Sequence, residues 1–221
     1  MPHSPATEIS AIQRERMVEL LRSRGIADTR VLAAMARVPR HEFVPPKFRE
    51  QAYEDYPLPI AEGQTISQPY IVAAMLEALA IAAADCVLEI GTGSGYVTAL
   101  LAELAGHVIS LERHPALADS AREVLARLGY RNASVIVSDG SRGFAENAPY
   151  DVILVSAAVA AVPPALVDQL GGGGRMVIPI GPADTQQLQL IRRQHGRHSV
   201  QLGEYCRFVP LIFGPADPGK E

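Results

Sequence analysis

Residues 87–96 read VLEIGTGSGY, and this stretch decides the fold class. A short apolar run ends in a glycine loop, and the helical period of TALLAELA follows at residues 98–105. A dinucleotide-binding loop would need its third glycine one position later, where Tyr96 stands. The stretch therefore favours a nucleoside with a short amino-acid arm over NAD. Three glycines let backbone amides approach such a ligand closely: Gly91, Gly93 and Gly95.

Strand-length apolar runs alternate with helical periods after this loop. This alternation predicts βαβ units and a parallel sheet that is buried on both faces. We therefore predict an α/β fold, with a Rossmann-like, doubly wound and mostly parallel sheet. Strands are expected at residues 85–90, 107–112, 133–139, 151–157, 175–181, 187–193 and 207–213. The turn RRQHGRH is expected between or near the last two strands, and Gly171 to Gly174 are expected to form a mobile connection from a helix at residues 163–170.

The first third of the chain has a different character. Residues 9–24 have spaced apolar residues amid charges, as a surface helix does, and a second helix is expected at residues 28–38, beginning at Asp28, a favourable capping residue. A proline-rich and aromatic segment follows, and the apolar run at residues 71–84 is expected to be a packed helix. We predict one structural domain in three parts. These are an N-terminal helical cap with the active-site segment (1–84), a core (85–214) and a frayed tail (215–221).

Composition excludes several classes of protein. The chain has 221 residues, of which 48% are hydrophobic and 20% charged, and a net charge of -4, so we expect a globular protein that does not bind nucleic acid. No run approaches the ~20 apolar residues of a membrane-spanning helix, and the first residues do not resemble a signal peptide. Cys86 and Cys206 indicate neither a disulfide framework nor a zinc site. We expect a cytoplasmic protein without a metal or a membrane partner.

Acidic residues stand at the ends of three successive predicted strands. Glu89 precedes the glycine loop and could meet an ammonium group, and Glu112 could accept hydrogen bonds from two ribose hydroxyls. Asp139, followed by Gly140, is placed to bind an adenine amine. Carboxyl ends of parallel strands form a crevice at one edge of the sheet, and these acceptors there predict S-adenosylmethionine as the ligand. The alternative is that each acid only caps a helix.

The stretch EGQTISQPY, residues 62–70, is open to two interpretations. Ser67 can be an ordinary helix N-cap, with Pro69 tolerated in the first turn of the helix. The same polar cluster can also be part of a catalytic site. Local sequence alone favours the first interpretation, because such helix starts are common.

From about residue 16 to 214, the chain resembles the protein-L-isoaspartate O-methyltransferases. The resemblance rests on VPRHEFVP, DYPLPIAEGQTISQPYIVAAM, VLEIGTGSGY, SDGSRGF, APYDVILVSAA, GGRMVIPIG and RFVPL. It implies an S-adenosylmethionine-dependent methyltransferase core, a monomer, and repair of damaged aspartyl and asparaginyl sites. Ala61 and Ser156 depart mildly from the family pattern. Ser67 matches the family's active-site serine, and cofactor contacts are implied at Glu89, Gly91, Gly93, Ser94, Gly95, Glu112, Asp139 and Gly140.

The implied chemistry needs few catalytic groups. A substrate carboxylate is already ionised at neutral pH, because its usual pKa is about 4, so it needs no general base to attack a sulfonium methyl group. Ser67 is then expected to position the substrate, and no nucleophile elbow surrounds it. We expect Thr65, Ile66 and Val209 to contact the substrate, an isoaspartyl peptide or a flexible protein segment.

Three alternatives remain at this point. The chain could methylate a specific peptide aspartate or a small-molecule carboxylate, although it has little sequence beyond the core for such recognition. The hypothesis of a nucleic-acid methyltransferase has less support, because DVILVSAAV lacks the Pro-Pro-aromatic motif that binds a flipped base. A nucleoside-binding module without catalysis would have no reason to retain EGQTISQPY.

Overall fold

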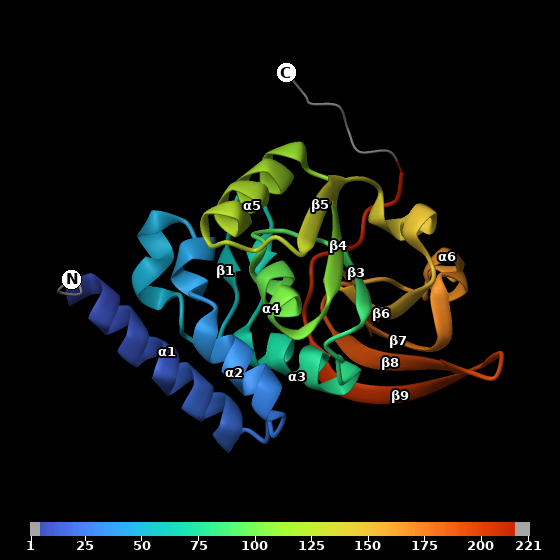
Figure 1. Cartoon of the computed structure of the whole chain (residues 1–221), viewed down its shortest axis with the longest axis horizontal. Coiled ribbons are helices and arrows are strands. Elements are labelled where there is room, and N and C mark those ends of the chain that lie inside the picture. Colours follow the sequence, from blue (N-terminus) through green and yellow to red (C-terminus); the bar gives the residue numbers. More distant parts are fainter. Residues whose placement is uncertain (1–4, 215–221) are drawn as a thin grey trace.

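A computed structural model describes residues 5–214 of the chain (Figure 1). The predicted tail at residues 215–221 lies outside the described residues. In the described part of the chain, no helix is long and apolar enough to cross a membrane.

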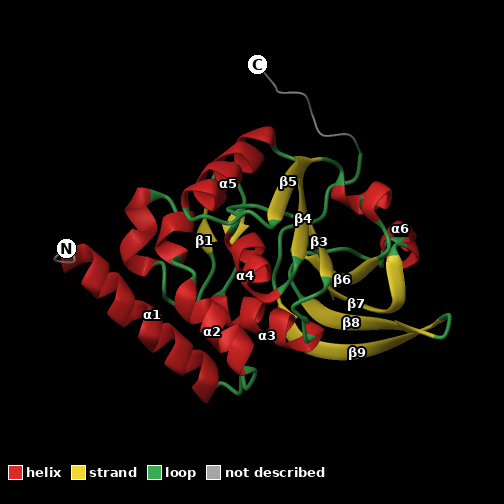
Figure 2. Ribbon diagram, in the orientation of Figure 1, coloured by secondary structure: helices red, strands yellow, loops and turns green. Residues whose placement is uncertain are grey.

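A seven-stranded sheet forms the centre of the molecule (Figure 2). Its order is β5-β4-β3-β6-β7-β8-β9. The first five strands in this order are parallel, and β8 and β9 are antiparallel to their neighbours, which confirms the predicted mostly parallel sheet. The strands are β3 (Cys86–Ile90), β4 (His107–Glu112), β5 (Ala133–Val137), β6 (Tyr150–Val155), β7 (Leu170–Ile180), β8 (Gln186–Gln194) and β9 (Arg197–Cys206).

Whereas β9 is exposed along almost its whole length, the central strands of the sheet are buried on both faces, as their apolar runs predicted. Alternate residues along β3 show this, since Val87 packs in one hydrophobic cluster and Leu88 in another. The larger cluster includes side chains of the cap and of α4 (Tyr96–Leu104) and α5 (Pro115–Arg127), and the smaller one includes Leu166 of α6 (Pro164–Asp168). Short 3-10 helices η3 (Gly140–Arg142) and η4 (Ala145–Asn147) connect β5 to β6.

Helices and short strands precede the core. They are α1 (Pro5–Ser23), α2 (Thr29–Arg37), η1 (Arg40–Phe43), η2 (Pro46–Gln51), β1 (Leu58–Pro59), β2 (Thr65–Ile66) and α3 (Pro69–Leu79). Asp28 caps α2 as predicted, because its carboxylate accepts hydrogen bonds from the backbone of Arg30 and Val31. In Figure 1, α1 and α2 lie at the end of the molecule opposite the β8–β9 hairpin. The boundary between cap and core at residue 84 stays a prediction.

The last strand is not where the sequence placed it. Residues 207–213 were expected to form it, but β9 spans Arg197–Cys206. His195 and Gly196 both have positive φ, 49° and 74°, as a tight hairpin turn requires, so pairing resumes directly at Arg197. The turn itself was predicted correctly. Residues 207–213 have no regular secondary structure apart from one isolated bridge, at Pro210.

The predicted mobile connection at Gly171 to Gly174 is also wrong. These glycines belong to β7, whose register against β6 shifts between Tyr150 and Val152. A Cβ atom on Gly174 would lie 3.0 Å from the carbonyl oxygen of Tyr150. The glycines therefore let the strand bulge tightly against its neighbour.

Candidate active site

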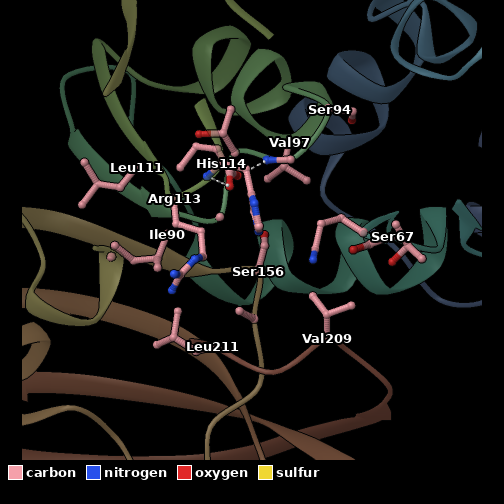
Figure 3. Close-up of a pocket in the computed structure, with 18 of the residues that line it drawn as sticks. Ser67, Ile90, Ser94, Val97, Leu111, Arg113, His114, Ser156, Val209 and Leu211 are labelled. Carbon is pink, nitrogen blue, oxygen red and sulfur yellow. Dashed lines mark hydrogen bonds between the residues drawn. The ribbon is translucent and has the colours of Figure 1, made fainter. Parts of the chain in front are cut away.

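A cleft opens at the carboxyl ends of the parallel strands. It lies where strand order reverses, since β4 and β5 follow β3 on one side and β6 and β7 lie on the other. In Figure 3, Ser67 and Val209 lie towards one end of the cleft, Leu111 and Leu211 towards the other, and Ser156 between them. The cleft holds about 800 Å³ of space, including open solvent at its mouth. Polar and apolar residues both line this cleft, as is usual for small-molecule sites.

The glycine loop forms one wall of the cleft. Gly91 and Gly93 line it with φ of 91° and 53°, conformations that side chains other than glycine rarely adopt. Ser94 also lines the cleft. Gly95 does not, and a Cβ atom there would lie 3.1 Å from the Cβ of Ala121 in α5. Gly95 therefore serves helix packing, and a ligand contact at this position stays a prediction.

Glu112 ends β4 inside the cleft and is only 5% exposed. One carboxylate oxygen accepts a hydrogen bond from the Gly93 backbone at 2.9 Å, and the other accepts one from the His114 backbone at 2.9 Å. Each carboxylate oxygen can accept a second hydrogen bond. Glu112 is therefore oriented by the backbone and can still bind ligand hydroxyls.

Glu89 lies beneath the cleft and is not among its lining residues. It is fully buried, and its Oε2 accepts hydrogen bonds from Thr98 Oγ1 at 2.5 Å and Ser110 Oγ at 2.6 Å. Its Oε1 has no partner among the described residues. Burial raises the pKa of Glu89 to about 8, although these two hydrogen bonds oppose the shift. A contact with a ligand ammonium group stays a prediction.

The sequence predicted that Asp139 and Gly140 both contact the cofactor, but the structure places the two residues differently. Asp139 caps η3 through Ser141, and its second oxygen accepts a hydrogen bond from the Gly214 backbone at 3.1 Å. Gly140 lines the cleft, and a Cβ atom there would lie 2.5 Å from Ile90 Cγ2. The helix-cap interpretation thus holds for Asp139, and its contact with adenine stays a prediction.

Ser67 lies in the cleft with Thr65 and Ile66, but it does not cap a helix. The N-cap position of α3 is Gln68, whose side chain makes no capping bond. Asp55 performs this task from a distance in sequence, accepting a hydrogen bond from the Tyr70 backbone at 2.9 Å. The prediction of Ser67 as an ordinary N-cap is therefore wrong, because the helix begins two residues later.

The segment at residues 207–213, which follows β9, contributes to the wall of the cleft. Backbone bonds of 2.8 Å join Ala158 to Val209 and to Leu211, so the segment is tied to the loop after β6. Val209 and Leu211 both line the cleft. Ser156 also lines the cleft, and its backbone donates a 2.8 Å hydrogen bond to the Ile90 carbonyl.

Sequence reasoning missed several lining residues. His114 lines the cleft two residues after Glu112, and its Nδ1 lies 3.8 Å from Oε2 of Glu62, the first residue of EGQTISQPY. Its position two residues after Glu112 was the feature of the sequence that could have identified it as a lining residue. The other missed residues are Gln64, Ile90, Thr92, Tyr96, Val97, Leu111, Arg113, Ala157, Pro210, Leu211 and Ile212.

Among residues 5–214, no group of three or more His, Cys, Asp or Glu side chains could hold a metal ion. The structure thus offers no candidate metal centre in the part of the chain that it describes.

Replacing Glu89 with glutamine should change how stability depends on pH. The folded protein retains a proton that the unfolded chain releases between the usual pKa of 4.5 and about 8, so the stability contributed by Glu89 falls as pH rises through this window. Glutamine resembles the protonated acid and does not titrate. Chemical denaturation at several pH values should show Glu89→Gln gaining stability relative to the original protein from pH 5 to 8. Glu123→Gln makes the same change at an exposed position and is the control. A stability difference between Glu89→Gln and the original protein that stays constant with pH would contradict the raised pKa of Glu89.

Comparison with known proteins supplies independent information on this cleft. The family model described as protein-L-isoaspartate(D-aspartate) O-methyltransferase matches residues 12–214. A protein-L-isoaspartate O-methyltransferase of Koribacter versatilis is 57% identical over 213 residues, with 96% of each chain covered. One of Methanoculleus marisnigri is 57% identical over 202 residues, covering 90% of this chain and 91% of the relative.

Solved structures agree. A protein-L-isoaspartate O-methyltransferase superposes with a TM-score of 0.81 at 30% identity, covering 92% of this chain and 67% of the other. A Plasmodium falciparum structure, described as a beta-aspartate methyltransferase in complex with S-adenosyl-L-homocysteine, gives a TM-score of 0.79 at 28% identity and covers 90% of this chain and 98% of its own. The family match covers the glycine loop, Glu112 and the Ser67 segment together, and the chain belongs to the protein-L-isoaspartate(D-aspartate) O-methyltransferase family.

Proposed function

We propose that this enzyme transfers a methyl group from S-adenosylmethionine to the free α-carboxylate of L-isoaspartyl residues, and of D-aspartyl residues, in damaged peptides and proteins. The neighbouring backbone amide nitrogen then attacks the ester carbonyl and displaces methanol, which closes a succinimide and so starts repair. One observation carries the proposal. A single cleft is lined by the glycine loop, by Glu112 and by the segment that carries Ser67. Family membership over residues 12–214 supports the same activity.

The residues of the cleft fit S-adenosylmethionine. Glu112 retains acceptor capacity for two ribose hydroxyls, and the loop at Gly91 and Gly93 allows close approach of the amino-acid arm. Ile90 and Leu111 provide apolar surface beside Gly140, where a nucleobase can pack. The Plasmodium falciparum relative was crystallised with the demethylated product, S-adenosyl-L-homocysteine, which supports the same ligand class here.

The sulfonium of S-adenosylmethionine supplies an electrophilic methyl group. The protein must then hold a carboxylate oxygen in line with that group and keep water away. In this scheme the Ser67 hydroxyl donates a hydrogen bond to the substrate carboxylate or the adjacent backbone. Thr65, Ile66 and Val209 contact the flanking peptide, and residues 207–213 restrict access of water to the cleft.

Geometry alone can distinguish isoaspartate from aspartate. An isoaspartyl linkage routes the backbone through the side-chain carbon, which adds a methylene to the main chain and leaves the α-carboxylate on a short arm. A site that holds the flanking backbone presents this carboxylate to the methyl group. A normal aspartate presents its carboxylate displaced by about one bond, and a displacement of about 1 Å can cost on the order of 100-fold in rate.

The cellular setting is part of the same proposal. Free thiols at Cys86 and Cys206 are compatible with a reducing cytoplasm. The net charge of -4 gives no general attraction to nucleic acid. A monomer and flexible protein segments as targets remain predictions from the family resemblance.

A pair of matched peptides tests the activity. The enzyme should transfer labelled methyl to a flexible isoaspartyl peptide and produce a base-labile ester. The aspartyl peptide, identical except for the linkage, should remain essentially unlabelled because its carboxylate is displaced. Equal labelling of both peptides, or labelling of neither by protein that binds the cofactor, would overturn the repair function. It would favour methylation of a particular peptide aspartate or a small carboxylate instead.

Ser67→Ala should reduce methyl transfer strongly while leaving stability and cofactor affinity close to those of the original protein. Ser67 does not cap α3, so little stability depends on its hydroxyl. Turnover, cofactor affinity and melting temperature can be measured on one preparation. Asp28→Ala is the matched control, since it removes a true cap and should cost about 1 kcal/mol of stability with turnover of the folded enzyme unchanged. Normal turnover by Ser67→Ala would rule out a positioning role.

Glu112→Ala should weaken binding of S-adenosylmethionine by roughly 10- to 100-fold, because charge-assisted hydrogen bonds contribute about 1.5 to 3 kcal/mol. Calorimetry measures this directly. Glu112→Gln should lose less, since it retains one acceptor oxygen for Gly93 or a ribose hydroxyl. Glu103→Ala removes an ion pair with Arg37 and a hydrogen bond from Tyr130, both outside the cleft; it is the control and should bind normally. Unchanged affinity in Glu112→Ala would contradict the ribose contact.

A further inference from the structure

Arg40 is a fully buried cation that the proposed chemistry does not use. It begins η1 in the cap, and its relative exposure is 0%. Its Nε donates a hydrogen bond to the Ala52 carbonyl at 2.7 Å, and its Nη2 donates one to the Ser67 carbonyl at 2.8 Å. Its Nη1 has no hydrogen-bond partner among the described residues. A buried charge with an unused donor is costly, so stability alone gives a poor account of it.

The guanidinium joins three separate segments. Ala52 follows η2 in the cap, and Ser67 lies in the cleft between β2 and α3. The third segment is α4, because the Arg40 guanidinium lies 4.8 Å from the centre of the Tyr96 ring. Tyr96 is the first residue of α4 and directly follows the glycine loop. Arg40 therefore contacts both the segment that carries Ser67 and the helix that starts behind the cofactor loop.

Local structure does not hold the backbone at Ser67. β2 ends at Ile66, and the first backbone bond of α3 runs from Val72 to the carbonyl of Gln68. The Ser67 carbonyl lies between these two elements and accepts its hydrogen bond from Arg40. A planar guanidinium with donors in fixed directions is suited to this task, because it holds two carbonyls and an aromatic ring at once.

We propose that Arg40 is a positioning residue that sets the distance between Ser67 and the glycine loop, and thereby aligns the substrate carboxylate with the transferable methyl group. This inference rests on the proposed methyl transfer. Loss of Arg40 would let the Ser67 segment shift relative to α4, and a shift of about 1 Å can cost on the order of 100-fold in rate.

Arg40→Met provides the test, with kcat, KM, cofactor affinity and melting temperature measured on the isoaspartyl peptide. Methionine fills much of the arginine volume without charge, and replacing buried ionic groups with apolar ones is often neutral for stability. We expect kcat to fall roughly 10- to 100-fold while cofactor affinity changes less than about threefold. Arg40→Lys should recover only part of the rate, since a lysine cannot reproduce the planar arrangement of donors.

Arg30→Met is the matched control. Arg30 is more exposed than Arg40, but it also donates to two backbone carbonyls from separate segments, that of Ile81 after α3 and that of Leu104 in α4, away from the cleft. This variant should lower the melting temperature and leave kcat of the folded enzyme unchanged. A similar pattern in Arg40→Met, with kcat unchanged, would show that Arg40 is only structural. Failure of both Arg40 variants to fold would likewise overturn the proposal.

A double-mutant cycle with Ser67→Ala tests whether Arg40 acts through Ser67. If it does, Arg40→Met should reduce kcat by a smaller factor in the Ser67→Ala background than in the original protein. Multiplicative effects would overturn the coupling. Absence of isoaspartyl methylation by the original protein would instead reject the proposed function, so the two failures are distinguishable.

Discussion

Two backbone hydrogen bonds join the carboxyl ends of the central strands β3, β4 and β6, and the geometry of the site depends on them. Gly91, directly after β3, donates to the Leu111 carbonyl of β4 at 2.8 Å, and Ser156, directly after β6, donates to the Ile90 carbonyl at 2.8 Å. These bonds fall where strand order reverses, so the chain leaves the sheet in opposite directions on the two sides. The cleft is the space that this divergence creates, and Glu112 and the glycine loop line it for the same reason.

The other half of the site comes from the cap and is held by long-range polar contacts. Asp55 supplies the cap of α3, and Arg40 binds the Ser67 carbonyl, although neither lies within ten residues of Ser67 in sequence. The reacting groups are thus carried by two parts of the chain that meet only in the folded protein. Because in-line methyl transfer depends on alignment rather than on a general base, the contacts between these parts have direct chemical consequences.

Local patterns predicted well where one physical rule dominated. HVISLE became β4 with its predicted bounds, because a continuous apolar run suits a strand buried on both faces. The same reasoning gave the wrong position for the final strand. RFVPLIF is equally apolar, but it lines the cleft and does not join the sheet. The tight turn at His195 and Gly196 decided the outcome, because pairing beside it is local and leaves residues 207–213 outside the sheet.

The sequence by itself determined the parallel α/β sheet, the glycine loop and the acidic residue at the end of β4, because each follows from periodicity or from a motif of adjacent residues. It also brought Ser67, Thr65 and Ile66 to attention through the family resemblance. Only the tertiary structure decided that Glu89 is buried beneath the cleft, that Asp139 caps η3, and that Arg40 contacts both Ser67 and Tyr96. Burial and long-range hydrogen bonds depend on which segments meet in space, and no local pattern specifies that.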